Sequence, residues 1–203
     1  MAFQKGENPN RPYRGAAIKV EPIRYKKAIK NIKKILADNP RDLCLFTLGI
    51  NTAFRASELL SIRYGQVKFK DVGETLEIKQ PKTKRYRMVT LNRAAIEALD
   101  NYLDNKWARS NFSKDDLIFR SQRGAVLTVP TVTSMVKRWC LDVGLEGNYG
   151  SHTLRKTWGY WQYQRGTQVA LLMEAFKHSN QRQTLDYLCI QDKDIQQIFD
   201  LEL

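Results

Sequence analysis

The sequence predicts an α+β fold, in which a mainly α-helical domain carries a small three-stranded antiparallel β-sheet. Two observations predict it. Apolar residues recur at helical spacings over most of the 203-residue chain, and three short segments between residues 66 and 91 alternate in the manner of strands. The length fits one domain that is large enough to bury a core.

Residues 1–22 predict a basic, flexible arm, because Pro9, Pro12 and Pro22 interrupt a polar segment that is rich in Lys and Arg. An arm that lies along a polyanion and a plain disordered tail explain this composition equally well. We expect residues 23–203 to form one domain.

Helical spacing of apolar residues begins at Ile23 and continues among many lysines, which predicts a helix with one apolar and one basic face. Asn39-Pro40 ends this helix, because a residue before proline avoids the α region. A second helix is expected over residues 41–51, and a third is expected to open near Arg55.

Three strands are expected next, over residues 66–70, 75–79 and 85–91, with turns at residues 71–73 and 81–84. Asn92 is a suitable N-cap for a helix that ends near residue 106. Residues 117–119 predict a short strand. Further helices are expected over residues 130–143, 152–164, 167–176, 181–190 and 192–201.

The charge is strongly positive, because 34 Lys and Arg residues outnumber 21 Asp and Glu residues. A net charge of +13 favours a polyanionic partner, with nucleic acid first and an anionic membrane surface second. Solubility alone remains an alternative, although it needs a net charge of only about 2–8. No apolar run approaches the roughly 18 residues of a membrane span, and the N-terminus lacks the apolar region of a signal peptide.

The three cysteines, Cys44, Cys140 and Cys189, are widely spaced and odd in number. They indicate neither a disulfide framework nor a zinc site, so we expect no metal, and a reducing, cytoplasmic location.

A set of residues suited to phosphodiester chemistry is spread along the chain: Arg55 with Glu58, His152 with Arg155, and His178 with Tyr187 nine positions later. A phenol can act as a nucleophile, guanidiniums can hold phosphate oxygens, and imidazoles can exchange protons. Taken singly, each has an ordinary structural explanation, such as a surface ion pair, a helix-dipole partner or a core tyrosine.

Two segments carry a resemblance to a known family. RDLCLFTLGINTAFRASELLSIRYGQVKF (residues 41–69) resembles the first conserved box of the tyrosine recombinases, the phage-integrase family. SHTLRKTWGYWQYQRGTQVALLMEAFKHSNQRQTLDYL (residues 151–188) resembles the second conserved box and continues to the position of the nucleophile. Its sequence is most similar to that of small single-domain members.

The resemblance implies a role for each residue. Arg55 and Arg155 correspond to the catalytic arginines, His152 and His178 to the histidines, and Tyr187 to the nucleophile. Glu58 corresponds to a supporting acidic position beside the first arginine. Lys82 corresponds to the β-turn lysine, judged by its distance from RMVTL, and Lys84 is the alternative because turn lengths vary.

The sequence departs from the family pattern at a few positions. Ala53 and Lys177 stand where many members have glycine, Gln66 stands at a commonly acidic position, and Lys156 stands where many members have histidine. None of these departures removes a catalytic group.

The resemblance implies site-specific recombination of double-stranded DNA through a 3′-phosphotyrosyl intermediate, without a cofactor, ATP or metal. It also implies a homotetramer on DNA from monomers in solution, in a bacterial or phage-encoded protein that acts on the nucleoid. The usual N-terminal core-binding domain is expected to be absent, because about forty residues precede the first box; a minimal protein and a fragment both fit. The alternatives are DNA relaxation of the type IB topoisomerase kind and a DNA-binding accessory protein that no longer cleaves.

Overall fold

The computed structural model describes residues 19–79, 86–103, 112–121, 123–190 and 199. The elements come in the order α1 (Lys26–Ile35), α2 (Pro40–Thr52), α3 (Ala56–Leu59), α4 (Tyr64–Val67), β1 (Thr75–Lys79), β2 (Tyr86–Thr90), α5 (Arg93–Leu103), α7 (Val129–Asp142), α8 (Ser151–Gln164), α9 (Val169–Phe176) and α10 (Gln181–Leu188). The fold is mainly helical with one small antiparallel sheet, as the sequence predicts.

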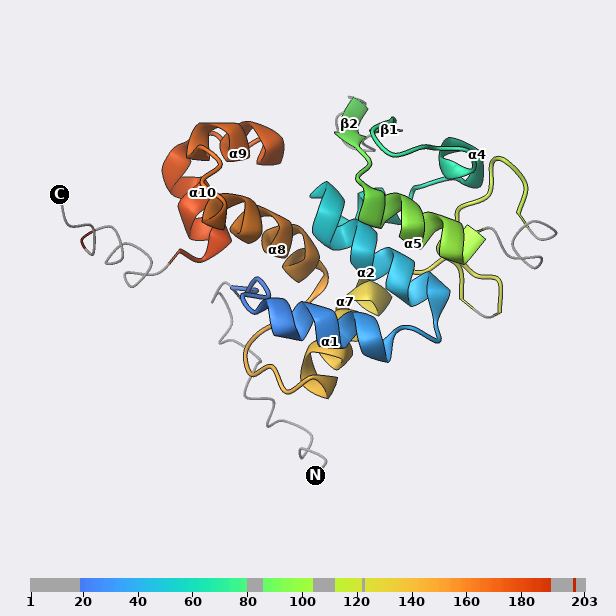
Figure 1. Cartoon of the computed structure of the whole chain (residues 1–203), viewed down its shortest axis with the longest axis horizontal. Helices are drawn as coiled ribbons and strands as arrows, with labels where there is room; N and C mark the ends of the chain where they lie inside the picture. The colour runs from blue at the N-terminus through green and yellow to red at the C-terminus, as the bar shows by residue number, and fades with distance from the viewer. Residues whose placement is uncertain (1–18, 80–85, 104–111, 122, 191–198, 200–203) are drawn as a thin grey trace.

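Helix α2 is the centre of the fold, because it packs against α1, α5 and α8 (Figure 1). Its apolar run is buried, including Cys44, Leu45 and Phe46, each with no exposed area. Asn39 caps the helix by accepting a hydrogen bond from the Asp42 amide, and Pro40 occupies the first turn. The predicted break between the first two helices is confirmed. Helix α2 ends at Thr52, three residues before Arg55.

A smaller apolar cluster lies apart from this core, around Ala53, Leu172, Phe176 and Leu188. It joins α9 and α10 to each other and to α8, and Figure 1 shows the three helices together at one side of the molecule. We call residues 169–188 the α9–α10 unit. Because its packing is separate from the main core, its position depends on a limited set of contacts.

One of those contacts is a close approach at Gly159 of α8. A Cβ atom at this position would lie 2.4 Å from Cζ of Phe176 and 2.6 Å from Cδ2 of Leu188, both of which are buried. The missing side chain therefore allows α8 to seat the α9–α10 unit.

Gly159→Ala is expected to lower the free energy of unfolding by about 1–2 kcal/mol, because overpacking outweighs the roughly 1 kcal/mol that alanine adds in helix propensity. Urea denaturation measures the change, with Gln164→Ala on the exposed face of α8 as the control. A Gly159→Ala protein that is as stable as the wild type would contradict this packing.

The sheet has two strands instead of the three expected, and the strand predicted over residues 66–70 is wrong. Gln66 and Val67 belong to α4, and the chain turns immediately afterwards. The Gln66 side chain accepts a hydrogen bond from the Arg63 amide at 2.8 Å and so caps the helix start. The alternation that suggested a strand comes from buried Val67 and from Phe69, which is exposed.

Strands β1 and β2 pair in antiparallel fashion, with Thr75 opposite Thr90 and Lys79 opposite Tyr86. The strand expected over residues 117–119 is reduced to an isolated bridge between Arg63 and Leu117. The helix expected over residues 192–201 lies, apart from residue 199, outside the described residues. Within the described part of the chain, no helix has both the length and the apolar character that crossing a membrane requires.

The described end of the predicted arm and the residue that follows it, Ile23, are held against the rest of the domain. The Glu21 amide donates to the Asn148 carbonyl at 2.8 Å, and the Ile23 amide donates to Oγ1 of Thr157 at 2.8 Å. The indole of Trp161 donates to the Ile23 carbonyl at 3.0 Å. Residues 1–18 of the arm lie outside the described residues.

Three of the described helices end at non-glycine residues in the left-handed region, namely α2, α9 and α10, the last at Cys189 with φ 58°. Ala53 follows α2 with φ 54°, and Lys177 follows α9 with φ 58°. At Ala53 and Lys177 many members of the resembled family have glycine, which adopts this conformation without strain. At Ala53 and Lys177, the departure from the family pattern therefore adds local backbone strain and removes no catalytic group.

Lys177→Gly is expected to raise the free energy of unfolding by about 0.5–1 kcal/mol, because it relieves a left-handed L-residue. The exposed ion pair of Lys177 with Glu174 contributes little. Arg165→Gly is the matched control, since Arg165 ends α8 with φ −87° and glycine there only adds entropy to the unfolded chain. Equal effects of the two substitutions in urea denaturation would contradict the strain.

Candidate active site

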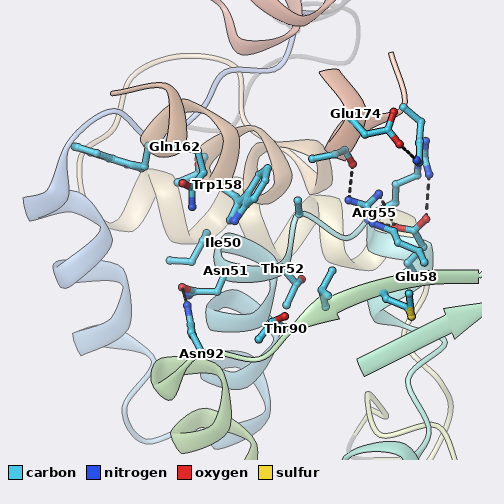
Figure 2. Close-up of a pocket in the computed structure, with 18 of the residues that line it drawn as sticks. Ile50, Asn51, Thr52, Arg55, Glu58, Thr90, Asn92, Trp158, Gln162 and Glu174 are labelled. Atoms are coloured by element: carbon cyan, nitrogen blue, oxygen red, sulfur yellow. Dashed lines mark hydrogen bonds and ion pairs between the residues drawn. The ribbon is translucent and has the colours of Figure 1, made fainter. Parts of the chain in front are cut away.

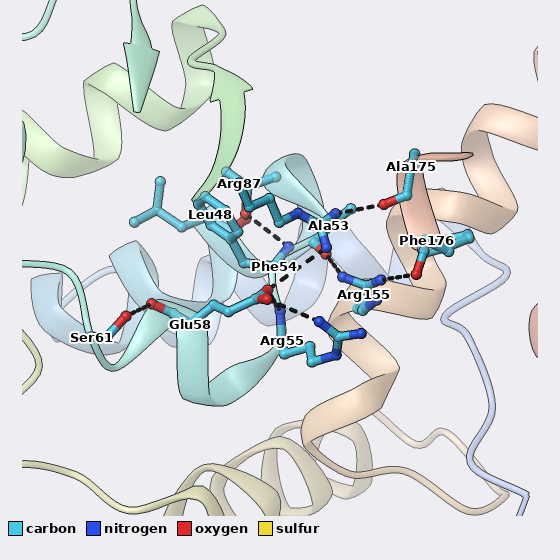
Figure 3. A network of polar contacts seen from close by, with 11 residues as sticks. Leu48, Ala53, Phe54, Arg55, Glu58, Ser61, Arg87, Arg155, Ala175 and Phe176 are labelled. Carbon is cyan, nitrogen blue, oxygen red and sulfur yellow. Dashed lines mark hydrogen bonds and ion pairs between the residues drawn. The ribbon is translucent and has the colours of Figure 1, made fainter. Parts of the chain in front are cut away.

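Arg55 stands at the start of α3, and the buried Glu58 holds it (Figure 3). One carboxylate oxygen of Glu58 accepts from the Arg55 guanidinium at 3.0 Å, and the other accepts from the Arg55 amide at 2.7 Å. Glu58 is 2% exposed, whereas the Arg55 side chain is 43% exposed. The carboxylate therefore orients a guanidinium that is partly exposed to solvent.

Arg155 lies on α8 with its side chain buried. Its guanidinium donates to the Ala53 carbonyl and, at 3.1 Å, to the Phe176 carbonyl. Its Cζ lies 4.8 Å from the centre of the Phe176 ring. Burial, with the nearby charge of Arg87, lowers the pKa of Arg155 to about 10, so the group is still charged at neutral pH. Arg155 joins α2, α8 and the α9–α10 unit at one point.

Tyr187 lies on α10, and His178 lies in the loop before that helix. The His178 ring meets the Tyr187 ring edge-on at 5.0 Å and stacks on Phe176 at 5.2 Å, while its Nδ1 is 3.1 Å from Oγ1 of Thr184. The Tyr187 hydroxyl is buried and makes no hydrogen bond of ordinary geometry among the described residues. It is a polar group without its usual partner, which a ligand could supply.

Burial raises the pKa of Tyr187. The positive charges of Arg155, Arg55 and Arg87 oppose that shift, together with a hydrogen-bonding contribution from the Arg155 guanidinium. The phenol is therefore protonated at neutral pH, but it lies where positive charge favours its anion.

His152 lies in the first turn of α8 and is exposed. Desolvation by the surrounding protein and the charges of Arg155, Lys156 and Arg55 lower its pKa. Desolvation, Arg155 and Arg55 also lower the pKa of His178. Both imidazoles are consequently neutral near pH 7 and can accept a proton or share a hydrogen bond.

Lys156 is buried beneath the tyrosine. Its Nζ lies 4.7 Å from the centre of the Tyr187 ring and 3.5 Å from Sγ of Cys189. The lysine that stands in place of the usual histidine thus supports the tyrosine through its ring.

Arg87 on β2 belongs to the same group, although the sequence interpretation gave it no role. Its Nη2 donates to the Ala175 carbonyl at 2.9 Å, and its Nη1 lies 3.8 Å from Oε2 of Glu58. The strand alternation could have indicated it, because Arg87 and Val89 share the inward face of β2. Arginine is rarely buried at an inward strand position unless it is paired, so a buried arginine there indicates a candidate functional residue.

The structure therefore groups Arg55, Glu58, Arg155, His178 and Tyr187, with His152 close enough to be influenced by the arginines. Lys82 and Lys84 lie outside the described residues. Among the described residues, no group of three or more His, Cys, Asp or Glu side chains could hold a metal ion.

An open groove of about 1610 Å³ adjoins the site between β2 and α8 (Figure 2). Arg55, Glu58 and Arg87 lie along it, but Tyr187 and Arg155 do not. We therefore assign the site by its chemistry, three guanidiniums around one phenol, and not by the size of the groove. Such an arrangement can bind an oxyanion and stabilise added negative charge.

The sequence profile of the phage integrase family matches residues 21–194. The chain belongs to the phage integrase family. A similar curated protein is the probable integrase/recombinase YoeC of Bacillus subtilis (strain 168), which is 30% identical over 175 residues, covering 85% of this chain and 91% of that protein. A tyrosine recombinase of Pseudothermotoga lettingae is 26% identical, covering 94% of this chain and 64% of that protein.

Solved structures of integrase-family proteins are similar as well. The XerH site-specific recombinase, in a post-cleavage complex with a palindromic difH substrate, matches with a TM-score of 0.71 and 25% identity. That match covers 87% of this chain and 50% of XerH. This integrase-family chain thus spans nearly the whole of the B. subtilis relative but only part of the longer recombinases.

Proposed function

We propose that this integrase-family protein is a site-specific DNA recombinase that cleaves and rejoins DNA through a 3′-phosphotyrosyl intermediate. One observation carries the proposal: the buried Tyr187 hydroxyl makes no well-formed hydrogen bond among the described residues and lies within the electrostatic influence of three arginines. Membership of the family and the DNA-bound XerH relative support it.

The reaction begins with attack of the Tyr187 oxygen on a scissile phosphate. A phosphorus–oxygen bond forms to the tyrosine, and the bond to the 5′ oxygen breaks. Arg55 and Arg155 bind the non-bridging oxygens, whose negative charge grows in the transition state. Glu58 keeps Arg55 oriented for this task, because it holds both the amide and the guanidinium of that residue.

The protons are assigned to three further groups. Since Tyr187 is protonated at neutral pH, it needs a base, and neutral His152 takes its proton. His178 donates a hydrogen bond to the phosphate. Lys82, or Lys84 as the alternative, protonates the departing 5′ oxygen. The covalent link conserves the phosphodiester energy, so the proposal requires neither ATP nor metal.

The net charge of +13 supports double-stranded DNA as the partner. The proposal includes a homotetramer on two DNA sites, assembled from monomers, and a cytoplasmic protein that acts on the nucleoid. It also treats residues 1–22 as an arm attached to a catalytic domain of residues 23–203.

The experiment offers the protein a nicked duplex, selected for tight binding from a randomised library, together with a second labelled duplex. We expect a covalent adduct first and then transfer of the cleaved strand to the second duplex. Relaxation of a supercoiled plasmid without strand transfer would instead indicate topoisomerase-like activity. Tight binding without any adduct would refute the proposal.

A further inference from the structure

Arg87 is held between two parts of the site by contacts that the proposed mechanism does not use. Its side chain is 11% exposed and lies over the Phe54 ring, with Cζ 5.7 Å from the ring centre. An arginine this deeply buried costs desolvation free energy, so its contacts must compensate for that cost. Those contacts lead in two directions.

In one direction Arg87 meets the carboxylate that holds the first arginine. Its Nη1 lies 3.8 Å from Oε2 of Glu58, the oxygen that accepts from the Arg55 amide. One buried carboxylate thus serves two guanidiniums. Since Nη1 of Arg87 has no hydrogen-bond partner among the described residues, this contact is an ion pair and not a hydrogen bond.

In the other direction Arg87 meets the end of α9. Its Nη2 donates to the Ala175 carbonyl at 2.9 Å, and Arg155 donates to the next carbonyl, that of Phe176, at 3.1 Å (Figure 3). The last carbonyls of a helix lack partners within the helix, so these two arginines satisfy two of them. They also fix where α9 ends, two residues before His178.

We infer that Arg87 is a positioning residue for the cleavage reaction proposed above, on which this inference rests. It spans from the Arg55–Glu58 pair to the α9–α10 unit and so sets the distance between the bound phosphate and the nucleophile. A second arginine is needed because the α9–α10 unit packs through its own small cluster and not through the main core. A misplacement of about 1 Å can reduce a rate by about a hundredfold.

Arg87 also contributes charge to the tyrosine. The charged or titratable groups that act on Tyr187 come from several elements and are Arg55, Arg87, Arg155, Lys156 and His178. Because the positive charge of Arg87 favours the phenolate, its removal raises the pKa of Tyr187 further. The basic limb of the pH–rate profile, by which we mean the part set by deprotonation of Tyr187, would then move to higher pH.

The test measures covalent adduct formation against pH with the selected nicked duplex. We expect Arg87→Gln to reduce the rate by about a hundredfold and to shift the basic limb upward. Arg87→Lys keeps the charge but lacks the second donor, so we expect a roughly tenfold slower rate with the limb unmoved. Duplex affinity should stay within about threefold for both, because the side chain is buried.

The control is Arg41→Gln, because Arg41 is another largely buried arginine that pairs with a carboxylate, Asp42, and donates to a backbone carbonyl. It should lower the melting temperature without changing the rate or the limb. Arg87→Gln with the wild-type rate and limb overturns the inference alone. If Arg87→Gln does not fold, a wild-type rate for Arg87→Lys overturns it. A wild-type protein that forms no adduct refutes the proposed function and this inference together.

Discussion

Arg155→Lys is expected to slow covalent adduct formation by on the order of 10²–10³ and to lower the free energy of unfolding by about 1–3 kcal/mol. Both effects have one cause. The guanidinium donates to the carbonyls of Ala53 and Phe176 at once, and a lysine ammonium cannot reproduce that planar fork. At least one buried carbonyl would lose its partner.

Arg155 therefore combines a structural and a catalytic task. Replacement by alanine would remove the charge and both hydrogen bonds together, so the lysine variant is the more informative one. Rates are measured on the nicked duplex and stability by urea denaturation, with Arg138→Lys on the exposed face of α7 as the control. A wild-type rate for Arg155→Lys would show that the fork is not needed in the transition state.

Tyr187→Phe is expected to abolish the adduct and to leave the protein as stable as the wild type, or more stable by about 0.5–1 kcal/mol. The rate effect follows because phenylalanine has no nucleophilic oxygen. The stability effect follows because the buried hydroxyl makes no well-formed hydrogen bond among the described residues, and Arg155 keeps its bonds to the Ala53 and Phe176 carbonyls when the hydroxyl is removed. A residue kept at a cost in stability is typical of a functional site.

Tyr163→Phe is the matched control, because Tyr163 packs against the same small cluster as Tyr187. We expect it to form adduct at the wild-type rate. Thermal melting and adduct formation are measured on both variants. A Tyr187→Phe protein that unfolds much more easily would mean that the hydroxyl has a structural role.

Most helices could be predicted from the sequence, because their signals are local. Asn39-Pro40 separates α1 from α2 in the sequence as in the structure, and Asn180 caps α10. The short α4 could not be predicted, because its start depends on the Gln66 side chain and on a backbone bond from Tyr64 to Asp116, far along the chain. Local alternation in that segment indicates a strand only in the absence of these contacts.

The residues of the candidate site also differ in whether the sequence alone could indicate them. Order and spacing were enough to select Arg55, Arg155 and Tyr187, because the resemblance depends on motifs within the chain. Arg87 was missed because its partners, Glu58 and the Ala175 carbonyl, are distant in sequence and come together only in the fold. The strain at Lys177 also became apparent only from its φ angle.

The most direct test of the central claim, that Tyr187 is the nucleophile, is to locate the covalent link itself. The wild-type protein is incubated with the selected nicked duplex, the adduct is digested with protease and nuclease, and the modified peptide is sequenced by mass spectrometry. We predict a nucleotide attached through phosphate to Tyr187 in the peptide that follows Arg182. A link at any other residue, or no link on a duplex that is tightly bound, would contradict the account.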